Sequence, residues 1–313
     1  MNASKRMEND TMKQMMKAAL CAVLLMMCLC GAAQAEIYFE QPPAAWQDKD
    51  VLEWTIFDTN EGDAMLLTCG GESMMVDGGP KPYREKLRDA LSARGLEHSM
   101  KYLFSTHYHD DHIDGLYYLM QYGFTAGEFL HGYKENFLQE EERLYRTIRQ
   151  AQRNEIPLRQ VQDGDLLTLG GAKLQVLHCT ELFGANARSL VLKVTFGESS
   201  LLLCADITGE VQRYFMENRP EGILDADIIK IAHHGLVPAV PEFLDTVTPG
   251  AAVVTNEKKT VFSGSMAQLE GRGIPALLSG EGAVRAVTDG KDWYILQAVG
   301  CFDPMEMVSG NKQ

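Results

Sequence analysis

The feature that most limits the possible folds is an alternation of short apolar runs with helix-like stretches, which begins at Val51. Short runs rich in branched and aromatic residues predict strands, and longer stretches with apolar residues three or four positions apart predict helices. The predicted strands are 51–57, 64–69, 73–76, 101–105, 173–177, 190–196, 201–205, 227–232 and 251–255. The predicted helices are 83–93, 111–122, 134–153, 210–217 and 240–246. No Pro/Ser-rich linker, sustained charge run or short repeat divides this pattern, so it predicts a single α/β domain with helices packed on sheets.

The first 35 residues have the features of a cleaved export signal. Lys13 and Lys17 form a positive flank before an apolar run at 18–30, and Ala33-Gln34-Ala35 supplies a small-x-small cleavage site. A membrane anchor is the alternative, but a helix that spans a bilayer needs roughly 20 apolar residues, more than this run provides. We therefore expect a signal peptide at 1–35 and a periplasmic or extracellular mature protein.

The cysteines bear on the state of that mature protein. A lipoprotein is a weaker alternative to simple export, because neither Cys28 nor Cys30 follows the small residue that usually precedes a lipid-attachment site. The cysteines beyond the signal are Cys69, Cys179, Cys204 and Cys301. Their wide spacing matches no zinc-knuckle pattern, and we expect buried thiols rather than disulfides. The expected organisation is a linker at 36–50, one domain at 51–300 and a tail at 301–313.

The charge of the chain limits its partners. The formal net charge is −14, and residues 1–35 hold four basic and two acidic side chains, so their removal would take it to −16. Tight, sequence-independent binding to nucleic acid depends on Lys and Arg that replace counterions on phosphates. Long nucleic acid is therefore a disfavoured partner, and a small-molecule or envelope-derived substrate is expected instead. The oligomeric state stays open.

Four residues with metal-binding side chains fall within six consecutive positions: His107, His109, Asp111 and His112. They lie between an apolar run that ends at Ser105 and a helix-like run that begins at Ile113. A loop from a strand to a helix can direct several side chains to one point, and imidazole nitrogen and carboxylate oxygen are suitable ligands for zinc-class ions. The cluster therefore predicts a metal site.

The pattern His-x-His-x-Asp-His after a strand resembles the signature of the metallo-β-lactamase superfamily. Further segments match this family in the same order: Asp77 in Val76-Asp77-Gly78-Gly79, Asp206 after the run 201–205, and His233-His234-Gly235 after the run 227–232. The segment Gly62-Asp63-Ala64, together with the His-His-Gly ending, resembles the ComEC-like, competence-type branch. The resemblance covers about residues 50 to 300 and implies an αββα sandwich, in which helices flank two mixed β-sheets.

The resemblance also implies a set of metal ligands. His107 and His109 would hold a first metal, Asp111 and His112 with His233 or His234 a second, and Asp206 would lie between the two. We favour His233 over His234, because it comes first after its strand. The expected ions are two divalent metals, Zn²⁺ before Mn²⁺. The superfamily's third histidine for the first metal is missing from the segment 183–189, so Asn186 or His178 is the candidate there. Competence-type proteins usually have Asp at the position of His109, so the sequence lies between the two patterns.

Other polar residues have simpler interpretations. His98 and His131 lie outside every motif and are expected at the surface. Asp63 either caps a turn or orients a ligand. Arg188, Lys81 and Lys230 are expected as surface charges, with contact to an anionic substrate as the alternative. The charged segment 134–153 is expected to be a solvated helix face rather than a lid.

These residues together favour a metal-dependent hydrolase that uses a two-metal-activated water. The resemblance to the ComEC-like branch implies phosphodiester hydrolysis, with Asp111 and Asp206 at the site and Asp77 behind it. Hydrolysis of lactones or β-lactams is the alternative within enzymes. A non-catalytic, metal-binding accessory protein is the alternative outside them, and the full ligand set argues against it.

Overall fold

The computed structural model describes residues 35–133 and 141–309. The chain divides into two compact units, Met1–Ala35 and Glu36–Gln313, and the second holds all the helices and strands given below. The signal peptide expected at 1–35 lies, apart from Ala35, outside the described residues. None of the described helices combines the length and apolar character needed to cross a membrane.

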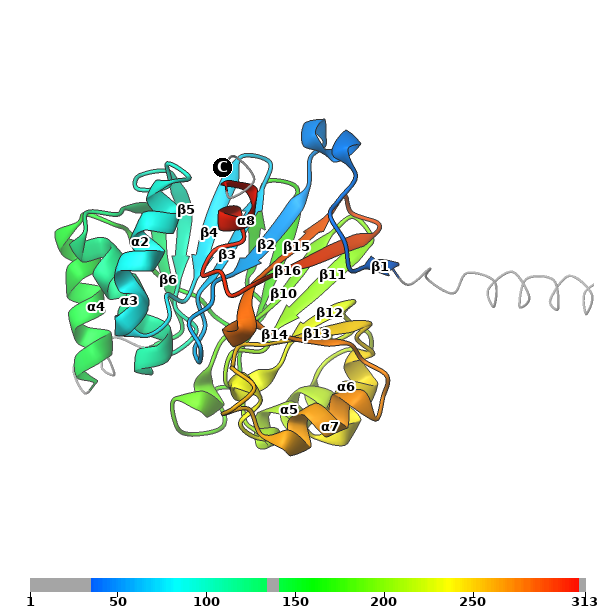
Figure 1. The fold of residues 1–313 in the computed structure, drawn as a ribbon. Helices are drawn as coiled ribbons and strands as arrows, with labels where there is room; N and C mark the ends of the chain where they lie inside the picture. The colour runs from blue at the N-terminus through cyan, green and yellow to red at the C-terminus, as the bar shows by residue number, and fades with distance from the viewer. Residues whose placement is uncertain (1–34, 134–140, 310–313) are drawn as a thin grey trace, which may run out of the picture. The chain divides into compact units, whose positions relative to one another are not determined.

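Two mixed sheets form the centre of the second unit (Figure 1). The first has the order β1-β16-β15-β2-β3-β4-β5-β6-β7. Its strands are β1 (Ile37–Tyr38), β2 (Leu52–Ile56), β3 (Met65–Cys69), β4 (Glu72–Val76), β5 (Met100–Phe104), β6 (Ala126–His131), β7 (Leu158–Gln160), β15 (Gly282–Thr288) and β16 (Trp293–Val299). The second has the order β14-β13-β12-β11-β10-β9-β8. Its strands are β8 (Leu166–Leu169), β9 (Ala172–Leu177), β10 (Val191–Phe196), β11 (Ser199–Leu203), β12 (Ile228–Lys230), β13 (Ala251–Val254) and β14 (Ala276–Leu278).

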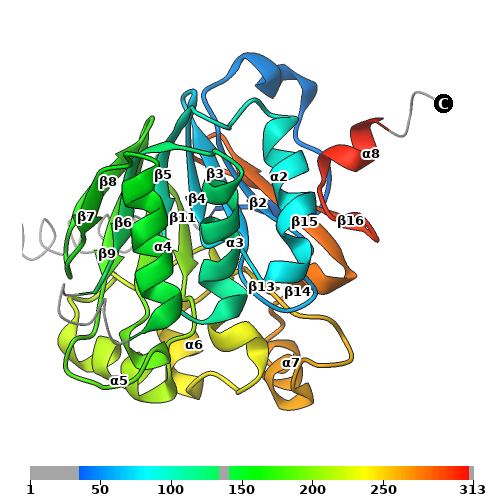
Figure 2. The same ribbon diagram turned by 90° about the vertical axis from the view of Figure 1, so that its left-hand side faces the viewer.

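Helices cover the outer faces of both sheets. On the first sheet these are α2 (Arg84–Ser92), α3 (Asp110–Gln121) and α4 (Glu142–Arg153), which lie side by side in Figure 2. On the second they are α5 (Gly209–Asn218), α6 (Pro241–Val247) and α7 (Ser263–Glu270) (Figure 1). Short helices connect the elements: η1 (Ala44–Asp48), η2 (Lys81–Tyr83), η4 (Asn186–Arg188), η5 (Ala232–Gly235), η6 (Ser279–Glu281) and α8 (Met305–Ser309). This arrangement confirms the α/β sandwich of two mixed sheets with flanking helices.

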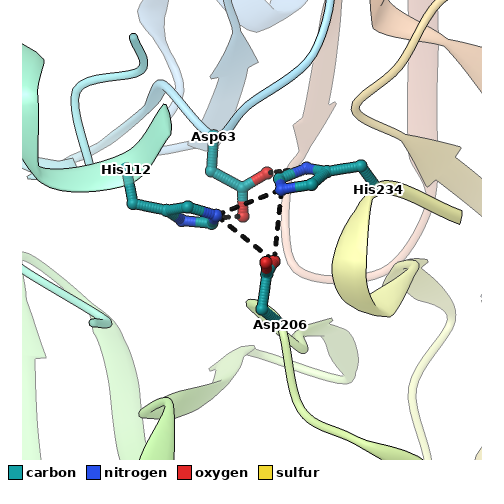
Figure 3. A group of neighbouring side chains, drawn as sticks. All are labelled: Asp63, His112, Asp206 and His234. Atoms are coloured by element: carbon teal, nitrogen blue, oxygen red, sulfur yellow. Dashed lines mark hydrogen bonds and ion pairs between the residues drawn. The ribbon is translucent and has the colours of Figure 1, made fainter. Parts of the chain in front are cut away.

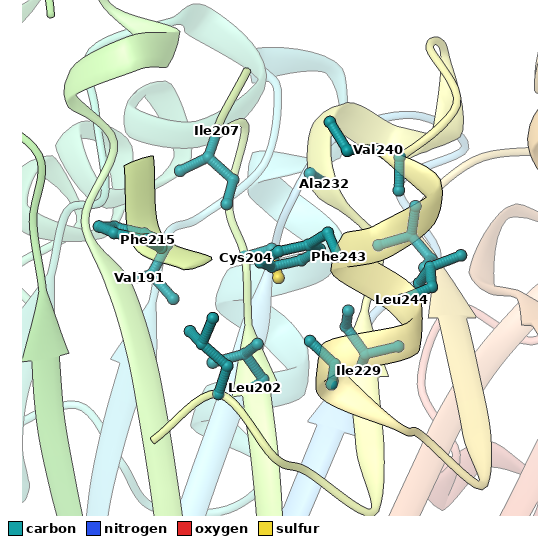
Figure 4. Packing of buried hydrophobic residues seen from close by; sticks show 14 of the residues in the cluster. Val191, Leu202, Cys204, Ile207, Phe215, Ile229, Ala232, Val240, Phe243 and Leu244 are labelled. Atoms are coloured by element: carbon teal, nitrogen blue, oxygen red, sulfur yellow. The ribbon is translucent and has the colours of Figure 1, made fainter. Parts of the chain in front are cut away.

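The strands are apolar on both faces because both faces are covered. Leu66 and Met75 belong to the core cluster shared with α2 and α3. Their neighbours Leu67 and Met74 point to the opposite side of the sheet and are also fully buried. In the second sheet, Leu202 packs in the cluster that includes residues of α5 and α6 (Figure 4). Burial on two sides explains why the sequence shows continuous apolar runs instead of an alternating pattern.

The structure contains several elements that the apolar pattern missed: β1, β6, β7, β8, β14, β15, β16 and α7. β15 carries Arg285 in mid-strand, where its guanidinium pairs with Glu53 of β2 at 2.6 Å, so the run is not uniformly apolar. β6 begins with Ala126-Gly127-Glu128, a poor strand signal. The predicted helix 134–153 corresponds to α4 from Glu142 onward, and 134–140 lie outside the described residues.

The segments expected as linker and tail contact the domain. In 36–50, β1 pairs in parallel with β16, where Ile37 lies opposite Trp293. In 301–313, the ring of Phe302 stacks on Phe57 at 5.5 Å, and Asp303 pairs with Arg94 at 2.6 Å. Both segments therefore add to the packing of the sandwich in the part of the chain that is described.

A close backbone contact fixes the start of α3, which carries the metal-binding motif. The Gly78 N–H donates to the carbonyl of His112 at 2.7 Å, and the Gly115 N–H donates to the carbonyl of Gly79 at 2.9 Å. A Cβ atom on Gly115 would lie 1.8 Å from the Gly78 carbonyl oxygen. The loop after β4 and the first turns of α3 can therefore approach this closely only with glycine at both positions.

We expect Gly115→Ala to destabilise the protein by about 3 kcal/mol or more, the upper range for overpacking, since the backbones must separate. Gly209→Ala is the matched control, because a Cβ there would meet only side-chain atoms, of Val240 at 3.3 Å and of Arg213 at 3.7 Å. Equilibrium unfolding in urea measures both changes. Equal unfolding midpoints for the two variants would contradict this reading of the contact.

Candidate metal centre

The candidate ligands lie at the ends of strands from both sheets. His107 and His109 follow β5, and Asp111 and His112 form the first turn of α3. Asp206 follows β11, and the pair at 233 and 234 follows β12 within η5. Asp63 lies just before β3. Figure 3 shows the rings of His112 and His234 facing each other, with Asp206 on one side of them and Asp63 on the other.

One set of side chains, which we call the second ligand group, comprises Asp111, His112, His234 and one oxygen of Asp206. The Nε2 atoms of His112 and His234 are 3.1 Å apart. Asp206 Oδ1 lies 3.2 Å from the first of these atoms and 3.3 Å from the other. Asp111 Oδ2 lies 3.0 Å from His234 Nε2 and 3.8 Å from His112 Nε2. Two imidazoles and two carboxylates thus converge on one point.

The first ligand group comprises His107, His109 and the other oxygen of Asp206. His107 Nε2 lies 3.2 Å from His109 Nδ1 and 3.8 Å from Asp206 Oδ2. His107 is fully buried, and the side chain of Asp206 is 2% exposed. Asp206 therefore faces the two groups with its two different oxygens, as a carboxylate that bridges two ions does.

Hydrogen bonds behind the imidazoles determine which ring nitrogens are free to bind a metal. His112 Nδ1 lies 2.8 Å from Asp77 Oδ2, which can only accept, so this nitrogen carries the proton. The Thr255 hydroxyl donates to Asp63 Oδ1 at 2.7 Å and accepts from His234 Nδ1 at 2.9 Å. Both Nε2 atoms of the second ligand group are thereby left as acceptors.

The same relay serves the first ligand group. The Thr106 hydroxyl donates to Asp77 Oδ2 at 2.6 Å and lies 3.1 Å from His107 Nδ1, from which it accepts. The Thr106 N–H also donates to Asp77 Oδ1 at 2.9 Å. Asp77 therefore braces the ligand loop without reaching the centre itself, the position implied by the family resemblance.

The resulting arrangement is suited to a cation. Lone pairs on two Nε2 atoms face each other at 3.1 Å, and the buried Asp206 Oδ1 has no hydrogen-bond donor. Such an arrangement is costly unless a positive charge lies between the atoms. The donor set of imidazole nitrogen and carboxylate oxygen suits Zn²⁺ or a similar transition metal. The residues present therefore fit a divalent ion in each group.

The electrostatics of the centre agree with this conclusion. Burial alone would lower the pKa of His112, but Asp206, Asp77, Asp63 and Asp111 around it raise that pKa to about 10. The pKa of His234 is likewise raised well above its usual range by Asp206, against the effect of burial. The carboxylates thus create a strongly negative site, which favours a second proton on the rings of His112 and His234. A bound metal would take the place of that second proton on each ring.

The two adjacent histidines point into different parts of the centre. Both have left-handed backbones, with φ of 52° at His233 and 51° at His234. His234 is buried in the second ligand group. His233 Nε2 instead lies 3.9 Å from Asp206 Oδ2, on the side of the first group, and 3.4 Å from Asn186 Nδ2. The expected preference for His233 as the ligand of the second metal does not match this geometry.

Asn186 and His178 were the candidates for the ligand missing from the first group. The structure brings Asn186 to the rim of that group through its contact with His233. His178 is buried but belongs to neither ligand group among the described residues. The His178 ring packs against Gly132, where an added Cβ atom would lie 3.3 Å from His178 Cε1.

Two expectations of surface exposure were wrong. Lys230 is completely buried, and its Nζ lies 2.6 Å from Asp63 Oδ2. His131 is 5% exposed, its Nδ1 accepts the Tyr133 N–H at 3.2 Å, and burial lowers its pKa to about 4. Both lie in or next to apolar strands, where the surrounding structure supplies their hydrogen bonds. His98 is exposed, as expected.

A polar cavity of about 590 Å³ lies next to the first ligand group. Its lining residues are Tyr108, His109, Glu141, Glu142, Arg143, Arg146 and Ala185. His109 belongs to both the cavity wall and the first ligand group, so the cavity adjoins that group. The Arg143 guanidinium lies 3.2 Å from Asp110, yet its side chain is 48% exposed and can be reached from solvent.

We expect the wild-type protein to bind close to two transition-metal ions per chain, and Asp206→Ala to weaken the binding of both. The reason is that Asp206 contributes one oxygen to each ligand group, and the loss of a shared ligand should lower each affinity by about 100-fold or more. Metal analysis after dialysis tests this, with the exposed Asp225→Ala as control. Unchanged metal content in Asp206→Ala would show that this residue does not bridge the groups.

Comparisons with known proteins agree with the fold. No curated protein matches the chain. Among solved structures, CmlA, a diiron β-hydroxylase from Streptomyces venezuelae, aligns with a TM-score of 0.51 and 15% identity over 80% of this chain and 55% of CmlA. The chain thus spans about half the length of that protein, and the likeness concerns the fold alone.

Two further structures are similar at lower scores. The metallo-beta-lactamase fold protein YhfI from Bacillus subtilis has a TM-score of 0.48 and 12% identity, over 73% of this chain and 98% of YhfI. A metallo-beta-lactamase from Cronobacter sakazakii has a TM-score of 0.39 and 17% identity, over 59% of this chain and 78% of its own. A family model described as Metallo-beta-lactamase superfamily matches residues 58–267, which include the strand ends that carry both ligand groups. The chain therefore belongs to the metallo-β-lactamase superfamily.

Proposed function

We propose that this protein is an exported, metal-dependent hydrolase of phosphate esters, with diesters as the first substrate class. The observation that carries the proposal is the position of Asp206, whose two oxygens face two separate ligand groups. Two divalent ions bound in these groups would activate a water for attack and stabilise the attacking and departing oxygens of the substrate.

The residues of this chain would hold and orient the components of that reaction. Asp206 would share its charge between the two groups, and Asp111 would complete the second. Asp77, through Thr106 and His112, would keep the ring nitrogens that face the centre free of protons. The depth of the ligands, with His107, His112 and His234 buried, would limit competing water.

The cavity beside His109 supports a phosphate ester as substrate. Arg143 and Arg146 place guanidinium groups on its wall, and guanidinium pairs well with phosphate oxygens. The strongly negative net charge of the chain favours a small or locally bound substrate over long nucleic acid. The Gly62-Asp63-Ala64 and His-His-Gly segments, similar to the ComEC-like branch, point to the same class.

Other activities are compatible with the fold. Hydrolysis of lactones or β-lactams would use the same pair of ions, and a metal-binding accessory protein would need no turnover. CmlA is a diiron β-hydroxylase, so iron belongs in the metal screen alongside Zn²⁺ and Mn²⁺. Arg143 and Arg146 share the cavity wall with Glu141 and Glu142 and pair with Asp110 and Asp114, so the similarity of segments 62–64 and 233–235 to the ComEC-like branch is what favours the phosphate ester over these alternatives.

A substrate screen tests the proposal. The protein loaded with Zn²⁺, Mn²⁺ or Fe²⁺ is offered an aryl phosphodiester, a phosphomonoester, a lactone and a β-lactam. We expect the phosphodiester to be cleaved fastest and His112→Ala to lower that rate by several powers of ten while the fold persists, because one lost imidazole disrupts the second ligand group. His98→Ala is the control, because His98 is exposed and belongs to neither ligand group, and this variant should retain full activity.

The other outcomes of the screen are equally informative. Faster turnover of the lactone or the β-lactam would move the protein to the lactonase or lactamase class. Metal binding without turnover of any substrate would favour the accessory-protein alternative.

Export is a separate part of the proposal, supported by the charged flank, the apolar run and Ala33-Gln34-Ala35. N-terminal sequencing of the protein recovered outside the cytoplasm should begin at or near Glu36. A full-length product retained in the cytoplasm would contradict export and leave the proposed chemistry untouched.

A further inference from the structure

Lys230 is a fully buried cation directly behind the second ligand group. Its Nζ forms an ion pair with Asp63 Oδ2 at 2.6 Å, donates a hydrogen bond to the Ala205 carbonyl at 2.9 Å, and lies 3.8 Å from Asp206 Oδ1. An ammonium group without exposure to water is costly unless carboxylates and carbonyls surround it. Asp63 and the Ala205 carbonyl therefore offset the cost of burying the Lys230 ammonium.

Each of the two partners of the ammonium, Ala205 and Asp63, supports a metal ligand. Ala205 directly precedes Asp206 and has a left-handed backbone with φ of 45°, and its carbonyl also accepts the His233 N–H at 2.9 Å. The bond from Lys230 thus fixes the strained turn that presents Asp206. Asp63, the other partner, holds the Thr255 hydroxyl that accepts from His234 Nδ1.

Asp63 lies on the side of the imidazoles that faces away from the metal position. Its oxygens are 3.4 Å from His234 Nδ1 and 3.8 Å from His112 Nδ1, whereas Asp206 and Asp111 approach the Nε2 atoms. Figure 3 shows Asp63 and Asp206 on different sides of the two rings. Asp63 is therefore placed to orient the ligands and not to bind the ion.

We propose that Lys230 is a positioning residue, which acts through Asp63 and Ala205 to set His234 and Asp206 at the spacing that the second metal requires. Asp63 lies just before β3 of the first sheet, while Lys230 ends β12 of the second sheet and Ala205 follows β11 of the same sheet. One ammonium group thus aligns ligand supports from the two sheets. The inference rests on the metal centre of the proposed function and is independent of which bond the protein hydrolyses.

Metal titration of Lys230→Met tests the proposal without any substrate. Met has a similar volume, so the packing is largely kept. The positive charge, the ion pair with Asp63 and the hydrogen bond to the Ala205 carbonyl are lost. We expect the affinity of the second ion to fall by about 10- to 100-fold, the usual range when a group that supports a ligand is removed. Binding of the other ion should change little. Calorimetric titration gives the affinities, and the absorption spectrum of the Co²⁺-loaded protein reports the geometry around the ion.

Lys193→Met is the matched control. Lys193 is also a buried lysine, 9% exposed, in β10 of the second sheet, where the charges of Asp227 and Asp225 act on it. In the described part of the chain, its side chain forms no hydrogen bond or ion pair with either ligand group, so its replacement should leave both affinities and the Co²⁺ spectrum as in the wild type. Equal effects of the two substitutions would overturn the proposal, since they would reflect the loss of any buried lysine.

The variant Asp63→Asn, nearly identical in shape, gives a second test if Lys230→Met folds poorly. It should lower the affinity for the second ion as Lys230→Met does. The double variant should lose no more affinity than the weaker-binding single variant, because the two residues act as a unit. Additive losses of affinity in the double variant would refute a positioning role. Unchanged binding of both ions in Lys230→Met or in Asp63→Asn would refute it as well. A wild type that binds two ions but hydrolyses nothing contradicts only the proposed function.

Discussion

The central constraint on this structure is the burial of several carboxylates and imidazoles at one place. Asp63, Asp77 and Asp206 are almost completely removed from water, together with His107, His112 and His234. Desolvation of so many polar groups opposes folding unless each finds a partner. The chain supplies partners for Asp77 and Asp63 through the Thr106 and Thr255 hydroxyls and the Lys230 ammonium. The ends of the strands must therefore lie where these bonds require, and the glycine contact between Gly78 and Gly115 allows them to do so.

Much of the sandwich could be predicted from the sequence because most central strands are buried on two faces and appear as apolar runs. The strands that escaped prediction have partners which only the fold reveals. Arg285 interrupts β15 but is neutralised by Glu53, more than two hundred positions earlier. β1 is too short to show any period, and it exists because β16 offers an edge to pair with. Local pattern cannot report on such distant partners.

The candidate site divides in the same way. His107, His109, Asp111 and His112 were visible because they are contiguous. The choice between His233 and His234 depends on two successive left-handed residues, a conformation that the sequence does not announce for histidine. The supporting residues Lys230 and Thr255 carry no local signal, since their partner Asp63 lies far from both in sequence. Lys230 resembled a surface charge until the structure placed a carboxylate against it.

The second ligand group also joins distant parts of the chain. His112 and His234 are 122 positions apart, and an ion held by both would close a loop of that length. A covalent cross-link across a similar loop removes chain entropy from the unfolded state equivalent to roughly 4–5 kcal/mol. A metal bound only in the folded state adds to stability by mass action in addition to any such effect. The ion would thus link the two sheets reversibly, and the supply of metal would govern how long each molecule of the protein stays folded.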